Sequence, residues 1–101
     1  MKLLLCSIPR SDASAFSRLL VTDLGAACVS VNDSVTSVYR WQGELCEEPE
    51  SLLMIKVASA KADGLRDALV KLHPYDLPEV LSLTLDEGGS YAPYIDWVEQ
   101  T

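Results

Sequence analysis

The stretch AACVSVNDSVTSVYRW at residues 26–41, followed by Gln42-Gly43 and a second extended segment that ends LLMIKVA at residues 52–58, decides the fold. In the first segment the larger apolar side chains occupy odd positions, namely Val29, Val31, Val35, Tyr39 and Trp41. A repeat of two is typical of a β-strand. Folded back at a glycine-containing turn, such a strand forms a ribbon that projects beyond the core of a 101-residue chain. We therefore expect other copies of the chain to cover the projecting part.

The composition predicts a single acidic domain spanning residues 1–101. The chain has 8 Lys and Arg against 15 Asp and Glu, which gives a formal net charge of −7. This charge argues against a nucleic-acid partner and favours cations as charged ligands. A chain of this length can bury only a modest core, so contacts between copies would add to its stability.

The cysteines and the apolar segments predict a cytoplasmic protein. Cys6, Cys28 and Cys46 are an odd number at irregular spacing, which is typical of free thiols in a reducing compartment. The apolar start of the chain is short and is interrupted by Pro9, so we interpret it as a buried strand, not as a signal peptide. No apolar run reaches the ~18 residues that a membrane span needs.

Hydrophobic spacing predicts the remaining elements. A helix is expected from a cap at Ser11-Asp12 to Gly25, and a second helix over residues 61–72, which Pro74 ends. Residues 80–85 alternate as a fourth strand, and residues 93–98 form a short final helix. Pro49 cannot donate a ladder hydrogen bond, so the ribbon should be irregular near its middle. The order βαββαβ with an added helix predicts an α+β ferredoxin-like plait.

Seven short motifs extend this prediction to a family. They are LCSIP at residues 5–9, GAACV at 25–29, TSVYRWQG at 36–43, MIK at 54–56, HPY at 73–75, PE at 78–79 and Tyr-x-x-Trp-Val at 94–98. In order and spacing they resemble the CutA family, whose members are called divalent cation tolerance proteins. The resemblance implies a compact homotrimer built by strand pairing between subunits, with an architecture similar to the PII signalling proteins. Departures from the family pattern occur at Ser30, Asn32-Asp33 and Val57, and Cys46 and Pro49 are particular to this chain.

Cys28, His73 and Glu79 are the candidate metal ligands. A thiolate is a soft ligand suited to Cu(I) or zinc, and the resemblance implies binding of copper or another divalent ion by cysteines and by the His-Pro-Tyr histidine. One imidazole is not a metal site, so Cys28, Glu79 or residues of another subunit would have to contribute. The alternatives are that Cys28 is a small buried apolar residue, and that His73 forms a structural corner bonded to the backbone.

A second group of residues, Tyr39, Trp41, Lys56 and Tyr75, is the candidate lining of a cleft between subunits. If subunits meet edge to edge, these side chains and Glu79 would supply aromatic walls and convergent charges around a small ligand or anion. The alternative is an interface salt bridge between Lys56 and Glu79, with Trp41 as a packing anchor. Four glutamates cluster near the ribbon tip, namely Glu44, Glu47, Glu48 and Glu50. They can hold a hard cation loosely, but such a run is more often solvated surface, and we interpret it so.

The sequence contains no recognisable catalytic motif. It lacks Gly-x-Ser-x-Gly, His-Glu-x-x-His and a phosphate-binding glycine loop, and its single histidine has no clear nucleophile partner. The leading hypothesis is a non-enzymatic, trimeric protein of divalent-cation tolerance that binds copper or another divalent ion. The alternative is a PII-like signalling or scaffold trimer that binds a small ligand or a partner protein between subunits.

Overall fold

The computed structural model describes all 101 residues. Its elements, in chain order, are β1 (Lys2–Ile8), α1 (Arg10–Thr22), β2 (Cys28–Trp41), β3 (Glu44–Val57), α2 (Ala62–Leu72), β4 (Val80–Thr84) and α3 (Ala92–Gln100). Two single 3₁₀ turns, η1 (Ser59–Lys61) and η2 (Glu87–Gly89), precede α2 and α3. The predicted order of strands and helices is therefore confirmed, including the added helix at the end.

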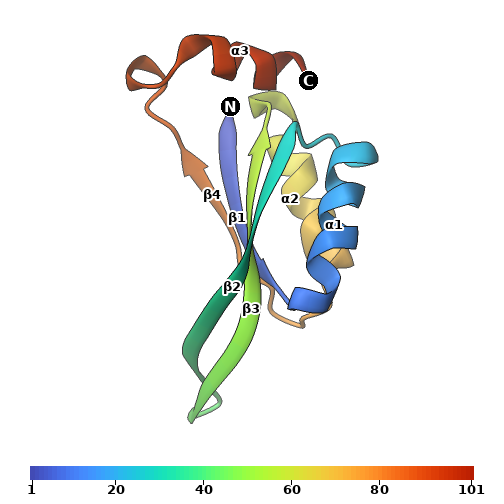
Figure 1. The fold of residues 1–101 in the computed structure, drawn as a ribbon, viewed down its shortest axis with the longest axis vertical. Coiled ribbons are helices and arrows are strands. Elements are labelled where there is room, and N and C mark those ends of the chain that lie inside the picture. The colour runs from blue at the N-terminus through green and yellow to red at the C-terminus, as the bar shows by residue number, and fades with distance from the viewer.

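The four strands form one antiparallel sheet in the order β2-β3-β1-β4. This order and connectivity are those of the ferredoxin-like plait, as predicted. Helices α1 and α2 lie together on one side of the sheet, and α3 crosses its end near the N-terminus (Figure 1). No helix in the structure has both the length and the apolar character required to cross a bilayer.

Strands β2 and β3 form the predicted ribbon. Each has 14 residues, but β1 pairs with β3 only between Ser51 and Val57, so the remainder of the ribbon extends alone below the sheet (Figure 1). The turn at its tip has positive φ at both central residues, 50° at Gln42 and 83° at Gly43. Positive φ at both positions is the geometry of a type I′ turn, whose twist matches that of the two strands.

A β-bulge divides the ribbon and corrects our prediction of one continuous apolar row. Asn32 pairs with Leu52 and Val35 pairs with Glu50, so Asp33 and Ser34 together lie opposite a single residue of β3. One extra residue moves every following side chain to the other face. Val29 and Val31 thus face the helices, whereas Val35, Tyr39 and Trp41 face the opposite side, which they share with Cys28.

The bulge has two local supports. The side-chain Oδ1 of Asn32 accepts a hydrogen bond from the Ser34 N–H at 3.2 Å, which closes an Asx turn. Arg10 donates from its guanidinium to the carbonyl oxygens of Glu50 and Val35, each at 3.3 Å. The irregularity predicted near the middle of the ribbon is therefore present, but it lies on β2, while Pro49 pairs in register with Thr36.

The start of α1 also differs from the prediction. Pro9 occupies the position before the helix, and Ser11 and Asp12 fall within the first turn, where no side chain caps a backbone N–H. Because proline has a fixed φ and no N–H, it suits a helix start without a side-chain cap. Gly25 follows the end of the helix with a φ of 90°, a left-handed conformation that glycine adopts without strain.

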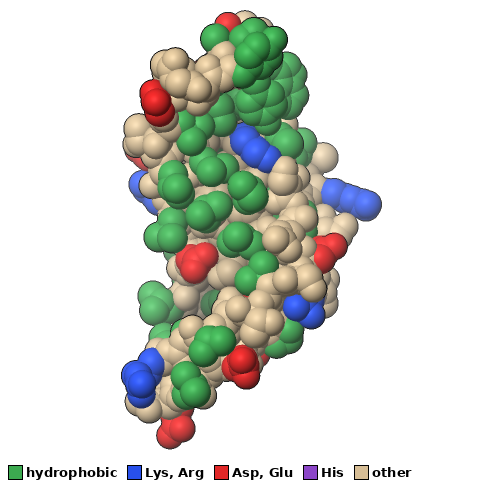
Figure 2. All heavy atoms as spheres, turned by 60° about the vertical axis from the view of Figure 1, so that its left-hand side comes forward, with side chains coloured by type: hydrophobic (Ala, Val, Ile, Leu, Met, Phe, Trp, Pro, Cys, Tyr) green, Lys and Arg blue, Asp and Glu red, His purple; other side chains and the backbone are tan.

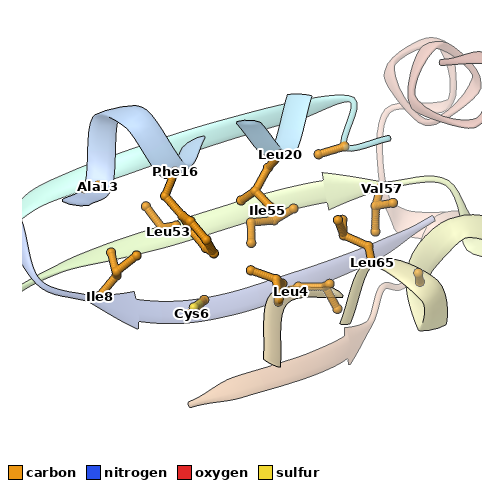
Figure 3. Close-up of a cluster of buried hydrophobic side chains, with 13 residues drawn as sticks. Leu4, Cys6, Ile8, Ala13, Phe16, Leu20, Leu53, Ile55, Val57 and Leu65 are labelled. Atoms are coloured by element: carbon orange, nitrogen blue, oxygen red, sulfur yellow. The ribbon is translucent and has the colours of Figure 1, made fainter. Parts of the chain in front are cut away.

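The main core lies between the sheet and the two helices α1 and α2 (Figure 3). Leu4 and Ile8 of β1 and Leu53 and Ile55 of β3 point toward the helices and are fully buried. Phe16 of α1 reaches down between them from the helix layer (Figure 3). The alternating pattern of the strands and the helical spacing of α1 thus converge on one layer of apolar side chains.

Cys6 belongs to this core and is fully buried. Burial, followed by the charges of Glu79 and Glu50, raises the pKa of its thiol from 9.0 to about 12. The native thiol therefore stays protonated at pH values where the thiol of an unfolded chain ionises. Because the folded pKa is the higher one, this stabilisation of the native state is complete below pH 9 and is lost as the pH rises toward 12.

We predict that Cys6 reacts with thiol reagents only when the chain unfolds. In a Cys28→Ser/Cys46→Ser double variant, labelling at pH 8 should be at least about a hundredfold slower than labelling in urea, because only the exposed thiolate reacts. Raising the pH to 10 should leave the native rate nearly unchanged. Absorbance assays with an aromatic disulfide reagent measure both rates, and fast labelling of the native variant would contradict the burial of Cys6.

The sheet face opposite α1 and α2, hereafter the open face, carries apolar side chains that no helix covers. These are Leu3, Leu5, Met54, Leu81 and Leu83, which the strand register places on one side. Leu81 is 53% exposed and Met54 is 38% exposed. Figure 2 shows hydrophobic side chains gathered over this part of the molecule and on α3 above it. Monomeric proteins rarely leave so continuous an apolar surface in water.

Candidate functional site

A groove of about 750 Å³ lies where the ribbon meets the segment between α2 and β4. Its floor includes Ser7 at the end of β1, and one wall comes from β2 and β3 beyond the bulge. The other wall is residues 74–79. Because of the bulge, the side chains of Tyr39 and Trp41 project to this side of the sheet and form part of the groove.

Three aromatic side chains line the groove. Tyr39 and Trp41 are two residues apart on β2, so they project to the same side, and they are 42% and 45% exposed. Tyr75 faces the groove from the opposite wall. Burial, with smaller effects from Cys46 and Glu48, raises the pKa of the Tyr39 hydroxyl. All three were predicted as cleft residues, and the structure brings them to one place.

Four carboxylates line the same groove, namely Glu48, Glu50, Asp76 and Glu79. None of them takes part in an ion pair, and no Lys, Arg or His is among the lining residues. The groove is therefore strongly acidic, which suits a cation and opposes the anion that the sequence also allowed.

Glu50 was interpreted from the sequence as solvated surface, and the structure corrects this. Its side chain is only 5% exposed, and its Oε2 accepts a hydrogen bond of 2.8 Å from the Tyr75 hydroxyl. Burial and this hydrogen bond raise the pKa of Tyr75. The second carboxylate oxygen, Oε1, receives no hydrogen bond within the chain and is not fully buried. Sequence reasoning named Glu50 only as one of four ribbon-tip glutamates and did not predict its burial or its bond to Tyr75.

His73 lies at the end of α2 with only 7% of its surface exposed. Its Nε2 is 2.7 Å from the carbonyl oxygen of Ser7, and its Nδ1 is 3.1 Å from the backbone nitrogen of Tyr75. A carbonyl only accepts and a backbone N–H only donates, so the ring is neutral with its proton on Nε2. This is the geometry of a structural corner, and a metal ion could bind Nδ1 only by displacing the Tyr75 N–H.

Cys28 and Lys56 lie together on the open face, next to α3. The Lys56 ammonium is 3.9 Å from the Cys28 sulfur and donates a short hydrogen bond to the Ser30 hydroxyl. Tyr94 of α3 lies near this pair. Burial and the nearby Cys28 raise the pKa of its hydroxyl. The Tyr94 ring packs against Trp97 with centroids 5.7 Å apart.

One protomer thus divides the predicted site residues between two places. Tyr39, Trp41, Tyr75 and Glu79 line the groove, whereas Lys56 and Cys28 lie at the other end of β3. No three Cys, His, Asp or Glu side chains are close enough together to hold a metal ion. A site that combines Cys28 or Lys56 with Glu79 would need a second copy of the chain, and both combinations remain predictions.

Comparison with known proteins agrees with the fold. The sequence profile of the family described as CutA1 divalent ion tolerance protein matches residues 2–101. This chain belongs to the CutA1 family. The divalent-cation tolerance protein CutA of Thermus thermophilus is 35% identical over 100 residues, which cover 98% of this chain and 95% of that protein. The match therefore spans almost the whole length of both proteins.

Two further proteins, one compared by sequence and one by structure, are also similar to this CutA1-family chain. A CutA homolog of Xenopus laevis is 43% identical over 86 residues, covering 85% of this chain, which spans only 56% of that longer protein. The apo structure of the PII-like protein CutA from Nostoc sp. PCC 7120 superposes with a TM-score of 0.94 at 38% identity, over 99% of this chain and 95% of that one. The CutA1 assignment thus agrees in sequence and in three-dimensional structure.

Proposed function

We propose that this CutA1-family chain forms a homotrimer in the cytoplasm and binds copper or another divalent metal ion without catalysing a reaction. The observation that carries the assembly is the open face, an apolar sheet surface that no helix of the protomer covers. Both outer strands, β2 and β4, also have one unpaired edge, which another copy can extend. The number of three copies comes from the family resemblance.

Cys28 is the best supported of the three metal ligands. Its thiol is partly exposed on the open face, whereas His73 already uses both ring nitrogens. A thiolate is a soft ligand that favours Cu(I) over harder cations. Because one protomer supplies no three-ligand cluster, the remaining ligands would come from other copies that meet at this face.

Copper titration under reducing conditions tests this role. We expect Cys28→Ser to weaken copper binding by roughly tenfold or more, because a hydroxyl is a poor Cu(I) ligand. Cys46→Ser, which removes the other partly exposed thiol, is the matched control and should bind like the wild type. Unchanged binding in both Cys28→Ser and His73→Ala would contradict the metal assignment.

A second candidate function is supported by the groove and by the likeness to a PII-like protein. In this alternative the trimer binds a small ligand or a partner protein in clefts between subunits, and Tyr39, Trp41 and Tyr75 contact the ligand. Thermal shift measurements with nucleotides, small anions and small cations test it. The acidic lining predicts no response to the anions and nucleotides, and a shift with cations.

A further inference from the structure

We propose that the α-ammonium of Met1 is a modification-sensitive latch for α3. The free amine holds α3 against the end of the sheet, and acetylation of this amine or an N-terminal extension releases the helix. This role is independent of copper binding and of any ligand bound between subunits. Its two supports are the ion pairs of Met1 and the small cluster through which α3 packs on the protomer.

The Met1 ammonium joins η2 and α3. Its nitrogen lies 2.6 Å from Oε1 of Glu87 in η2 and 2.5 Å from Oε1 of Glu99 in α3. The same Glu99 oxygen accepts hydrogen bonds from the N–H and the hydroxyl of Ser59 in η1, at 3.2 and 3.0 Å. Figure 1 shows the N-terminus beneath α3. Glu99 is thus the residue through which α3 is attached both to Met1 and to η1.

Met1 is the buried member of this group. The residue exposes only 6% of its surface, whereas the side chains of Glu87 and Glu99 are 53% and 37% exposed. Hydrogen bonds to Glu87 and Glu99 raise the pKa of the ammonium from 8.0, and the hydrogen bond to the ammonium lowers the pKa of Glu99. The Met1–Glu99 pair is therefore charged at neutral pH. A charged amine with so little access to water depends on its carboxylate partners.

Few other contacts hold α3 on the protomer. Its buried side chains belong to a cluster of four buried residues, separate from the main core between the sheet and the helices α1 and α2. The four are Met1, Ala27, Ile95 and Val98. A hydrogen bond of 2.6 Å from Lys61 to the Thr101 carbonyl oxygen is a further polar anchor. Segments with few buried contacts open at low cost in free energy, so a change at Met1 should act on α3 before it acts on the main core.

Acetylation changes this place in two ways. The amine, after losing one proton to water, attacks the carbonyl carbon of an acetyl thioester; a C–N bond forms, the C–S bond breaks, and the thiol leaves with a second proton. The product is a neutral amide with one N–H, which can bond only one of the two carboxylates. The acetyl group also needs space where Met1 exposes only 6% of its surface, so acetylation has to precede folding. Glu87 and Glu99 are partly exposed and can turn to water, so we expect α3 to move away while the sheet stays folded.

Hydrogen exchange of two matched full-length chains tests the latch. A synthetic thioester of residues 1–5, with a free or an acetylated amine, can be ligated to the rest of the chain at Cys6, which preserves the sequence. We expect the amides of α3 to exchange about tenfold faster in the acetylated chain, and those of α1 to be unchanged. A chain with Gly-Ser added before Met1 should match the acetylated chain. Equal exchange of α3 in all three chains, or an equal acceleration in α1, would overturn the proposal.

Charge variants separate the ion pair from the bulk of the acetyl group. With a free amine, Glu99→Gln should speed the exchange of α3 by roughly threefold, since it removes one charge of the pair. In the acetylated chain, which has no ammonium, the same substitution should change little, because coupled groups are not additive. Glu44→Gln, the same change at the ribbon tip, is the matched control and should leave α3 unchanged in both chains. Equal effects of Glu99→Gln in the two chains would show that Glu99 acts through Ser59 alone, which contradicts the latch.

Discussion

Replacing Leu4 with alanine is expected to lower the free energy of unfolding by about 3 kcal/mol. Leu4 is fully buried at the centre of the sheet, where it pairs with Ile55 on one side and Ser82 on the other. Its side chain points into the layer formed with Phe16, Leu20 and Leu65 (Figure 3). Strand β1 is held by two neighbouring strands, so it cannot move to fill the cavity, and the full packing loss is expected.

Urea denaturation followed by circular dichroism measures this change. Because the proposed assembly would add concentration-dependent stability, wild type and variants must be compared at one protein concentration. Leu72→Ala makes the same chemical change on α2, where the side chain is 50% exposed, and should cost less than about 1 kcal/mol. Equal losses at Leu4 and Leu72 would contradict the placement of the core.

Regular periodicity explains why most of the fold could be predicted. In β1 and β3 the alternating residues Leu4, Ile8, Leu53 and Ile55 all face the helices, as a repeat of two requires. This pattern could not predict the bulge at Asp33 and Ser34. Val29 and Trp41 both occupy odd positions, and yet they lie on opposite faces of the sheet. The available signal was Asn32, whose side chain favours a local turn over a ladder hydrogen bond.

The groove was predictable only in part for the same reason. Tyr39, Trp41 and Tyr75 were predicted to line a cleft between subunits, and the structure places all three around one groove of the protomer. The burial of Glu50 was not predicted, because the residue belongs to an acidic run of sequence that is typical of exposed surface. Its burial depends on Tyr75, which is distant in sequence and donates a hydrogen bond to it. Lys56 was grouped with these residues, but six positions along β3 separate it from Glu50, a distance of about 20 Å in a strand.

Lys56 lies away from the groove within one protomer, so a site that contains both requires a second copy of the chain. A single protomer has an acidic groove without a base at one end and a lysine beside Cys28 at the other. The predicted cleft that contains both can exist only where two copies meet. The functional predictions therefore depend on whether the open face is buried against other copies of the chain.

Replacing Leu81 with glutamate should convert the proposed trimer to monomers. Leu81 lies on the open face beside Leu5 and is 53% exposed in the protomer, so a carboxylate there remains hydrated in a monomer and the fold should persist. In a trimer closed over this face, three unpaired carboxylates would lose their hydration, which costs several kcal/mol for each. We expect the concentration needed for assembly to rise by roughly a thousandfold.

Sedimentation velocity at several concentrations measures this change directly. The wild-type chain should sediment as a trimer and Leu81→Glu as a monomer with an unchanged circular dichroism spectrum. Val70→Glu places the same charge on α2, where the side chain is 47% exposed on the helix-covered side, and should leave the trimer intact. A Leu81→Glu variant that sediments like the wild type would show that the open face is not an interface, and a site shared between copies would then have to form at the ribbon or at a strand edge.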